Sequence, residues 1–414
     1  MSKKISVKNK SPLLVRFYNV FLHMCYKVNL VNYKIDKNYY LKMLDREKAQ
    51  GTDTNYLARK ALEKFIDNVN QNELNPATET FIRNELKRVF VNRRKINKIL
   101  IQHPTIVSAD LHNPVFIVGL PRTGTTALQR LFSMLEKCRV LKLWELHHPT
   151  SLLEGKRSVN SAKREAKKYS FLQNFSKPEQ KYIHPVGANY PDECFRLLFN
   201  SFTSIAVSSA LGLEDYEKWV LDNDMLSTYK EYKQQLQILS QGDNDKQLVL
   251  KAPEHLWNLD VLLEVFPTAR LIITHRNLST SIVSYASMIS MFRRTAYNKP
   301  DFKRLGSYVT EVFKKGLDRA ISTRKKIDLT ERVLDVHCDD IQKLPFQTIT
   351  KICDFLSIGI NDKDSKNIKR WLENKKVDEP GVHYYEYDKY GINKDLIEKD
   401  FCYYDDQKYK TIKP

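Results

Sequence analysis

Residues 115–126 read Val-Phe-Ile-Val-Gly-Leu-Pro-Arg-Thr-Gly-Thr-Thr, an apolar run that leads straight into a loop bounded by two glycines. An unbroken apolar run of this length predicts a strand that is buried on both faces. The spacing of Gly119 and Gly124 matches the motif GxxxxGK[ST], in which backbone N–H groups at a helix N-terminus hold a phosphate. Thr125 stands where that motif has its lysine, and the only cation of the loop is Arg122. The stretch therefore predicts a phosphate-binding loop that is poorly suited to a magnesium-bound triphosphate.

The segments around this loop predict an α/β fold. Helical spacing of apolar residues covers 36–105, and after the loop we expect strands at 140–144, 247–250, 269–274 and 331–336 with helices at 125–135, 193–240, 255–266 and 278–291. Alternation of strands and helices is typical of a parallel sheet. We predict a three-layer, P-loop-like domain at 113–414 with a central parallel sheet and a helical insertion around 151–240. A helical N-terminal cap at 1–112 is expected to form one compact unit with it.

Two further segments have a distinctive composition. Residues 151–182 are polar and lysine-rich with little periodicity, which favours a solvated insertion or mobile lid, with a solvated helix as the alternative. Residues 12–24 are mostly apolar, but Arg16, Asn19 and His23 interrupt them, and they are fewer than the ~20 residues of a spanning helix. We expect no transmembrane segment here but an amphipathic helix packed on the domain, with a membrane anchor as the alternative.

The net charge of +19 points to a polyanionic partner. No block of basic residues interleaved with aromatics forms a nucleic-acid module, so we expect no nucleic-acid partner. An enzyme for polyanionic ligands fits the charge, and peripheral contact with an acidic membrane remains open. The cysteines are scattered without a CxxC pair, which predicts free thiols, a cytoplasmic location and no zinc site. The sequence does not define an oligomeric state.

Three polar segments follow predicted strands, where ligands of open parallel sheets bind. The first is the loop at 119–126, the second contains Lys251, and the third begins with Arg276. Ser284 comes eight residues after Arg276, so an arginine at a helix start and a hydroxyl two turns along could hold a second phosphate. No carboxylate suited to magnesium follows a strand, so we predict no metal.

These segments resemble the sulfotransferases that use 3′-phosphoadenosine 5′-phosphosulfate (PAPS). Residues 119–126 look like the family's 5′-phosphosulfate loop, and residues 275–284 look like its 3′-phosphate segment. Further similarity lies in Trp144–Pro149, Pro191–Cys194, Leu250–Leu256, His383–Tyr385 and Tyr390–Ile392. The resemblance spans roughly residues 40–405. It is to the large, mostly bacterial-type group related to the tyrosylprotein sulfotransferases.

The resemblance implies PAPS as the cofactor, with no metal, and roles for individual residues. Arg122 would contact the phosphosulfate, and Lys251 would stabilise the sulfuryl group or the bridging oxygen. Arg276 and Ser284 would bind the 3′-phosphate, which would discriminate against ATP. The 5′-phosphate would be cradled by Thr123, Gly124, Thr125 and Thr126. His383 and Tyr385 could close over the adenine or the 3′-phosphate, since aromatic side chains supply stacking area.

The acceptor's proton needs a general base. Pro253 stands where cytosolic sulfotransferases carry a histidine two residues after the lysine, so the chain departs from their pattern. The tyrosylprotein type uses a glutamate after the first helix of the core, and Glu145 fits that place. We therefore predict Glu145 as the base, with His255 as the alternative; Glu193, His147 and His148 remain further candidates.

The sequence thus predicts an enzyme that moves a sulfuryl group from PAPS to a hydroxyl or amine of a small-molecule or peptide acceptor. Sulfuryl transfer resembles phosphoryl transfer in needing cations around the charge that develops on the transferred group. The alternatives are a P-loop kinase or nucleotide hydrolase, and a catalytically inactive anion-binding protein of the same fold. Apolar residues near 195–207 hint at a hydrophobic acceptor, but packing in the core is the favoured explanation for them.

Overall fold

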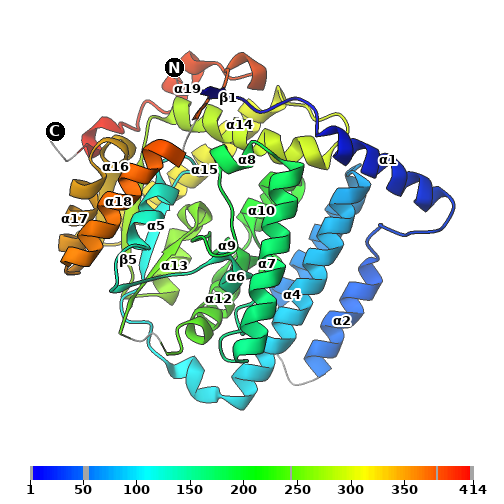
Figure 1. Cartoon of the computed structure of the whole chain (residues 1–414), viewed down its shortest axis with the longest axis horizontal. Helices are drawn as coiled ribbons and strands as arrows, with labels where there is room; N and C mark the ends of the chain where they lie inside the picture. The colour runs from blue at the N-terminus through cyan, green and yellow to red at the C-terminus, as the bar shows by residue number, and fades with distance from the viewer. Residues whose placement is uncertain (1–2, 50–55, 243–244, 379–380, 411–414) are drawn as a thin grey trace.

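The computed structural model describes residues 3–49, 56–242, 245–378 and 381–410 (Figure 1). Its centre is a five-stranded sheet of order β3-β4-β2-β5-β6 in which all neighbouring strands are parallel. The strands are β2 (Val115–Gly119), β3 (Cys138–Val140), β4 (Gln247–Lys251), β5 (Arg270–His275) and β6 (Val333–His337). A separate two-stranded parallel sheet pairs β1 (Lys3–Ile5) with β7 (Gly381–His383). The predicted α/β fold with a central parallel sheet is confirmed.

Alternation along the strands produces the three layers. In β2, Phe116 and Val118 face the larger core cluster, whereas Val115 and Ile117 face a second cluster on the other side of the sheet. Both sets are fully buried, which is why the strand reads as an unbroken apolar run. The smaller layer consists of α5 (Thr125–Phe132), α16 (Cys338–Lys343), α17 (Pro345–Leu356) and α18 (Asp362–Asp378).

The larger layer begins with the N-terminal helices. The predicted helical region at 36–105 forms α2 (Lys37–Ala49), α3 (Tyr56–Gln71) and α4 (Pro76–Gln102). The later helices of this side are α9 (Phe195–Leu198), α10 (Ile205–Leu211), α11 (Glu214–Asp222), α12 (Leu226–Leu239), α13 (Leu259–Val265), α14 (Leu278–Ala296) and α15 (Arg304–Lys326). Between β4 and α13 lies the 3₁₀ helix η3 (Pro253–Asn258), and α19 (Lys394–Asp400) packs near the C-terminus.

Two predictions about the segments after α5 need correction. The strand expected at 140–144 is wrong, because β3 ends at Val140 and α6 (Leu143–His147) begins two residues after Leu141. Glu145 accepts a hydrogen bond from the Lys142 backbone N–H at 2.7 Å and so caps this short helix. The lysine-rich segment is the helix α7 (Lys156–Ser176), followed by α8 (Gln180–Ile183), so the helical alternative is the one that the structure adopts.

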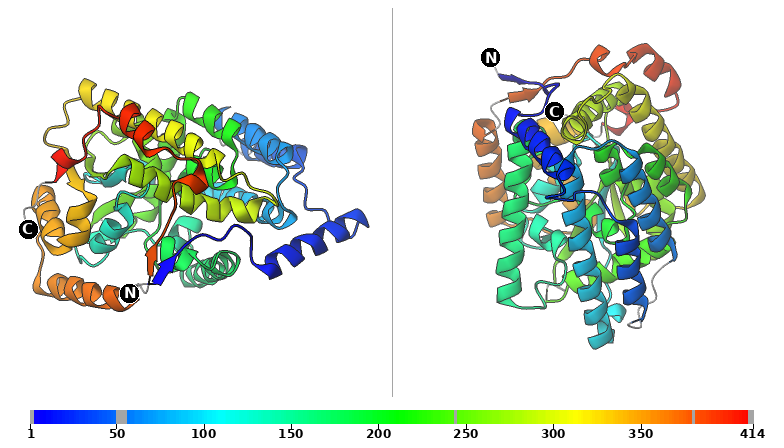
Figure 2. Two further views of the ribbon diagram at one scale, coloured as in Figure 1. Left: turned by 90° about the horizontal axis from the view of Figure 1, so that it is seen from above. Right: turned by 90° about the vertical axis from the view of Figure 1, so that its right-hand side faces the viewer.

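The N-terminal helix α1 (Leu13–Lys27) contacts α4 and lies at the edge of the molecule, where the left view of Figure 2 shows it projecting. It buries only Val15, Asn19 and Leu22. The predicted helix is therefore present, but it does not pack on the domain with its apolar face, since most of its apolar side chains face outward. No helix in the described part of the chain is long and apolar enough to cross a membrane.

Candidate active site

The register of the sheet brings the three predicted segments together. Strand β2 lies between β4 and β5, and Ile117 pairs with Lys251 while Gly119 pairs with Thr274. Because the strands are parallel, the loop after Gly119 is flanked by the ends of β4 and β5. Lys251 is the last residue of β4, and Arg276 follows β5 directly.

The loop between β2 and α5 leaves its backbone N–H groups open to a ligand. Arg122 and Gly124 have φ values of 73° and 97°, so the chain curls over before α5 starts. No described side chain caps the first turn of α5. The Thr123 hydroxyl points into the fold, where it donates to the Leu120 carbonyl at 2.7 Å. Thr123 could therefore serve an anion only through its backbone, at a helix N-terminus suited to negative charge.

Gly119 is required by close packing as well as by its turn. A β-carbon there would lie 2.4 Å from the Thr274 hydroxyl and 2.7 Å from the Thr274 carbonyl oxygen. Its φ of 147° is also unfavourable for other residues. The first glycine of the motif thus allows β5 to approach the loop.

Two arginines meet at the loop without a carboxylate partner. The Arg276 guanidinium donates to the Arg122 carbonyl oxygen at 2.9 Å, and Arg122 Nε donates to Ser284 Oγ at 3.1 Å. Burial, together with the neighbouring charge of Arg276, lowers the pKa of Arg122 to about 10. Neither arginine forms an ion pair with any described carboxylate, whereas Arg196, which is also buried, is paired with Asp192. Such an uncompensated positive pair is a fitting site for a polyanion.

Lys251 lies beside the start of α5. Its Nζ donates to Glu193 Oε1 at 2.6 Å and to Thr126 Oγ1 at 3.2 Å, and the side chain is 1% exposed. The lysine is therefore held between the phosphate loop and a carboxylate.

The C-terminal segment closes over the arginine pair. Burial and the charges of Arg122 and Arg276 lower the pKa of His383 to about 3. Its Nε2 lies 2.9 Å from Ser287 Oγ, whereas its buried Nδ1 has no hydrogen-bond partner among the described residues. Tyr385 packs edge-on against the His383 ring at a centroid distance of 5.2 Å. The structure thus brings both residues to the loop, and their roles there stay predictions.

Neither of the two favoured base candidates reaches this site. Glu145 is 4% exposed, and its carboxylate accepts from Arg139 at 2.7 and 3.2 Å as well as from the Lys142 backbone. His255 is fully buried, with Nδ1 2.8 Å from the Tyr229 hydroxyl, and burial lowers its pKa to about 3. Neither side chain lines the pocket at the loop.

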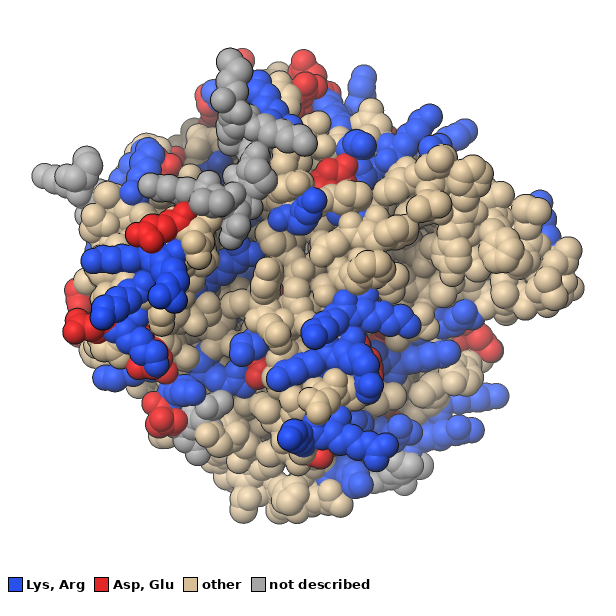
Figure 3. Space-filling model, in the orientation of Figure 1, with Lys and Arg blue, Asp and Glu red and all other residues tan. Residues whose placement is uncertain are grey.

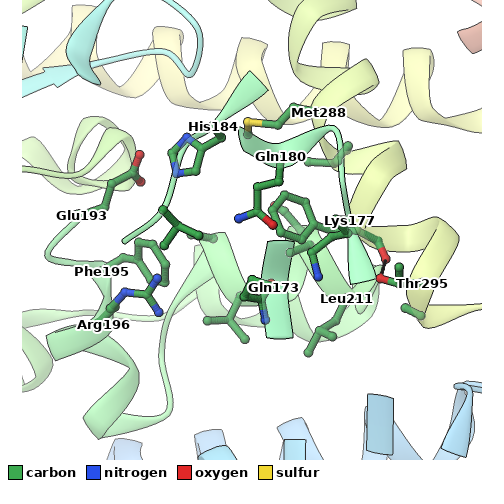
Figure 4. A pocket seen from close by; sticks show the side chains of 18 of the residues that line it. Gln173, Lys177, Gln180, His184, Glu193, Phe195, Arg196, Leu211, Met288 and Thr295 are labelled. Carbon is green, nitrogen blue, oxygen red and sulfur yellow. Dashed lines mark hydrogen bonds between the residues drawn. The ribbon is translucent and has the colours of Figure 1, made fainter. Parts of the chain in front are cut away.

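A pocket of about 760 Å³ extends from the loop between α4, α7, α10 and α14 (Figure 4). Its walls are mainly apolar and include Phe65, Phe81, Phe175, Phe195, Phe199, Trp257, Met288, Ile289 and Phe292. Arg122, Thr125, Thr126, Arg276 and Glu193 form its inner end. The loop is therefore continuous with a large apolar space.

The pocket also contains two residues that sequence reasoning missed. His184 lies on the same side as Glu193 in Figure 4, and burial lowers its pKa to about 4, so its ring is neutral at pH 7. Glu254 is 4% exposed, its Oε1 has no hydrogen-bond partner in the described part of the chain, and burial raises its pKa to about 8. Glu254 stands three residues after Lys251, a spacing that could have drawn attention to it. His184 has no such signal, because it enters the site from the chain after α8.

No cluster of histidine, cysteine, aspartate or glutamate side chains suited to a metal ion occurs among the described residues. Likewise, none of the six cysteines, all within the described ranges, forms a disulfide.

A parallel α/β sheet with a glycine-bounded loop after β2, and with threonine in place of the Walker lysine, defines a P-loop-like fold. Comparison with known proteins is more specific. Residues 114–362 match the sequence model described as "Sulfotransferase family", which is more than half of the chain. The chain belongs to the sulfotransferase family, whose members transfer sulfuryl groups.

Two mycobacterial crystal structures are similar in fold. Sulfotransferase STF1 from Mycobacterium tuberculosis H37Rv is 23% identical, with 94% of this chain and 98% of that chain covered at a TM-score of 0.71. Sulfotransferase STF9 from Mycobacterium avium is 21% identical, with 88% and 95% covered at a TM-score of 0.76. No curated protein sequence matched the chain.

Proposed function

We propose that this protein is a PAPS-dependent sulfotransferase that acts on a hydroxyl group of an acceptor with an apolar body. The observation that carries the donor assignment is the pair Arg122 and Arg276, which has no described carboxylate partner and lies beside the uncapped N-terminus of α5. A nucleotide with two separate phosphate groups could place one at the N-terminus of α5 and the other at the arginine pair.

The residues of the loop are suited to the 5′ end of the donor. The N-terminus of α5 would hold the 5′-phosphate with backbone N–H groups, and Arg122 would bind the phosphosulfate. Arg276 and Ser284 would hold the 3′-phosphate, with His383 and Tyr385 covering the nucleoside. PAPS supplies the sulfuryl group together with a phosphate leaving group.

Lys251 is suited to neutralise charge on the leaving oxygen or the sulfuryl oxygens during in-line displacement. A buried ammonium acts strongly there, because little water screens it. Its contact with Thr126 orients it toward the loop.

As the general base that takes the proton of the acceptor hydroxyl, we favour Glu193 over the predicted Glu145. Glu193 lines the pocket and touches Lys251, whereas the carboxylate of Glu145 is already occupied by Arg139. Glu193 would accept the proton of the acceptor hydroxyl as the oxygen attacks sulfur. The neutral ring of His184 offers a second acceptor for that proton.

Thermal unfolding with nucleotides tests the donor assignment. The nucleotide product of the proposed reaction, 3′,5′-bisphosphoadenosine, should alone stabilise the protein in a concentration-dependent way, by ~2.7 kcal/mol at 100 times its Kd. Stabilisation by ATP with magnesium, but not by the bisphosphate, would instead support a kinase or hydrolase. Transfer of labelled sulfate from PAPS to long-chain alcohols, compared with sugars and peptides, tests the acceptor class.

A further inference from the structure

The outward face of α1 is mainly apolar, with Arg16, His23 and Lys27 as its exposed polar and charged side chains. Phe17, Phe21 and Met24 are each 60–62% exposed, and Leu13, Leu14, Tyr18 and Val20 are exposed as well. The chain that follows continues this surface with Val28 and Leu30. Contiguous exposed apolar surface of this kind marks a site of interaction rather than ordinary solvent-facing surface.

The C-terminal part of α7 adds to this surface. Phe171, Leu172 and Phe175 are exposed, and the rings of Phe171 and Phe175 stack with centroids 6.2 Å apart. We call the exposed apolar side chains of α1 together with these three residues the apolar rim. Leu14 and Tyr18 of α1 line the same pocket as Leu172 and Phe175 of α7, so the rim borders the pocket that leads to Arg122.

The charge around the rim is positive. The first 35 residues contain no Asp or Glu but include Lys3, Lys4, Lys8, Lys10, Arg16, Lys27 and Lys34. Helix α7 has one acidic residue, Glu165, against Lys156, Arg157, Lys163, Arg164, Lys167 and Lys168. Figure 3 shows lysine and arginine side chains bordering the uncharged surface that projects at the right, where Figure 1 shows α1.

We propose that the apolar rim docks on an anionic lipid bilayer, with α1 lying in the plane of the interface. Amphipathic helices with a basic border bind membranes in this way, through apolar insertion and attraction to acidic headgroups. A second copy of the chain fits the surface less well, because its basic border would meet the same charge. The pocket would then open toward the hydrocarbon layer. Docking itself depends on neither the donor nor turnover.

Vesicle sedimentation of the full chain tests the proposal. The protein should bind vesicles of phosphatidylcholine with phosphatidylglycerol more tightly than vesicles of phosphatidylcholine alone, and added salt should reduce that difference. Replacing Phe17 and Phe21 together by serine should weaken binding at least ~30-fold, because two large apolar side chains no longer insert. The matched control is Ile101→Ser, because Ile101 is as exposed as Phe17, at 62%. It lies at the C-terminal end of α4, whereas Asn19 of α1 contacts Ala77 at the N-terminal end of that helix. The control variant should bind as the unaltered protein does.

A second variant separates charge from apolar insertion. Replacing Lys167 and Lys168 by glutamate should remove the preference for acidic vesicles. All variants alter exposed side chains, so their thermal midpoints and their response to bisphosphoadenosine should not change.

Three results would overturn the proposal. One is failure of the unaltered protein to sediment with either type of vesicle. Another is equal loss of binding in the Ile101 control. The third is a shift from dimer to monomer in the Phe17 and Phe21 variant without vesicle binding, which would make the rim a self-association surface. A protein that binds vesicles but not bisphosphoadenosine would refute the donor assignment and leave docking intact.

Discussion

Replacing Arg276 by alanine should weaken binding of a 3′-phosphate far more than binding of a 5′-phosphate. Arg276 has no described carboxylate partner, and among the described residues its side chain hydrogen-bonds only the Arg122 carbonyl oxygen, at 2.9 Å. Its remaining donors are therefore available to a ligand. Removal of the side chain eliminates a cation and also one support of the loop at Arg122, whose φ is 73°.

The magnitude follows from these two losses. A charge-assisted hydrogen bond to phosphate contributes ~1.5–3 kcal/mol, which corresponds to ~10–150-fold in Kd. Loosening of the loop should weaken any 5′-nucleotide equally. Calorimetric titration with 3′,5′-bisphosphoadenosine and with 5′-AMP separates the effects, because the ratio of their affinities reports the 3′-phosphate alone. That ratio should fall ~10–150-fold in the variant.

Two controls make the comparison decisive. Arg164→Ala removes an exposed arginine of α7 and should leave the ratio unchanged. Ser284→Ala, which removes the hydroxyl that accepts from Arg122 Nε, should lower the ratio by a smaller factor. If Arg276→Ala weakens both nucleotides equally, the arginine only supports the loop, and the assignment of the 3′-phosphate site is refuted.

The remaining predictions concern the base, a buried acid and the N-terminus. Glu193→Gln should lower kcat ~10²–10⁴-fold yet bind bisphosphoadenosine at least as tightly as the unaltered protein does. Glu145→Gln should lower the thermal midpoint but retain turnover. If Glu145→Gln instead loses turnover while Glu193→Gln keeps it, Glu145 is the base. Folding raises the pKa of Glu254 from 4.5 to about 8, so its carboxyl stabilises the fold most below pH 4.5, and the free energy of unfolding should fall as the pH rises to 8. Glu254→Gln should flatten that dependence in denaturant titrations, and an unaltered slope would show that this carboxyl does not titrate in the window. Deleting residues 1–10 should weaken bisphosphoadenosine binding in the same calorimetric assay, and an unchanged Kd would show that β1 has no influence on the donor site.

Most of the fold could be predicted because the strands are buried on both sides. Unbroken apolar runs such as 115–118 and 271–273 have one simple interpretation, and the sheet order then places their ends together. The predicted donor residues Arg122, Lys251 and Arg276 converge for that reason. The segment at 140–144 misled because its short, mostly apolar run fits a strand. The cap formed by Glu145 instead starts a helix there.

The sequence did not clearly predict helix α7, because the residues on its buried face are small or polar. They occur at helical spacing but have little hydrophobicity: Ala162, Ala166, Ser170 and Gln173. For α1 the apolar pattern predicted a helix correctly, yet a pattern does not reveal whether distant elements cover the apolar face. The same limit applies to Glu145, since its partner Arg139 is near in sequence but became apparent only from side-chain geometry.

The N-terminal strand β1 meets the C-terminal segment beside the proposed donor site. Strand β1 pairs with β7, and the Tyr384 backbone N–H donates to the Ile5 carbonyl oxygen at 2.8 Å, next to His383. Further along, Ser11 Oγ donates to the Arg294 carbonyl oxygen on α14 at 2.6 Å, one residue before Pro12 introduces α1. Helix α14 also carries Ser284 and the hydroxyl that meets His383, so it contacts the donor residues, the N-terminal segment and the pocket wall. A rigid helix with all three contacts explains why the N-terminal residues should influence nucleotide affinity although none of them lines the loop.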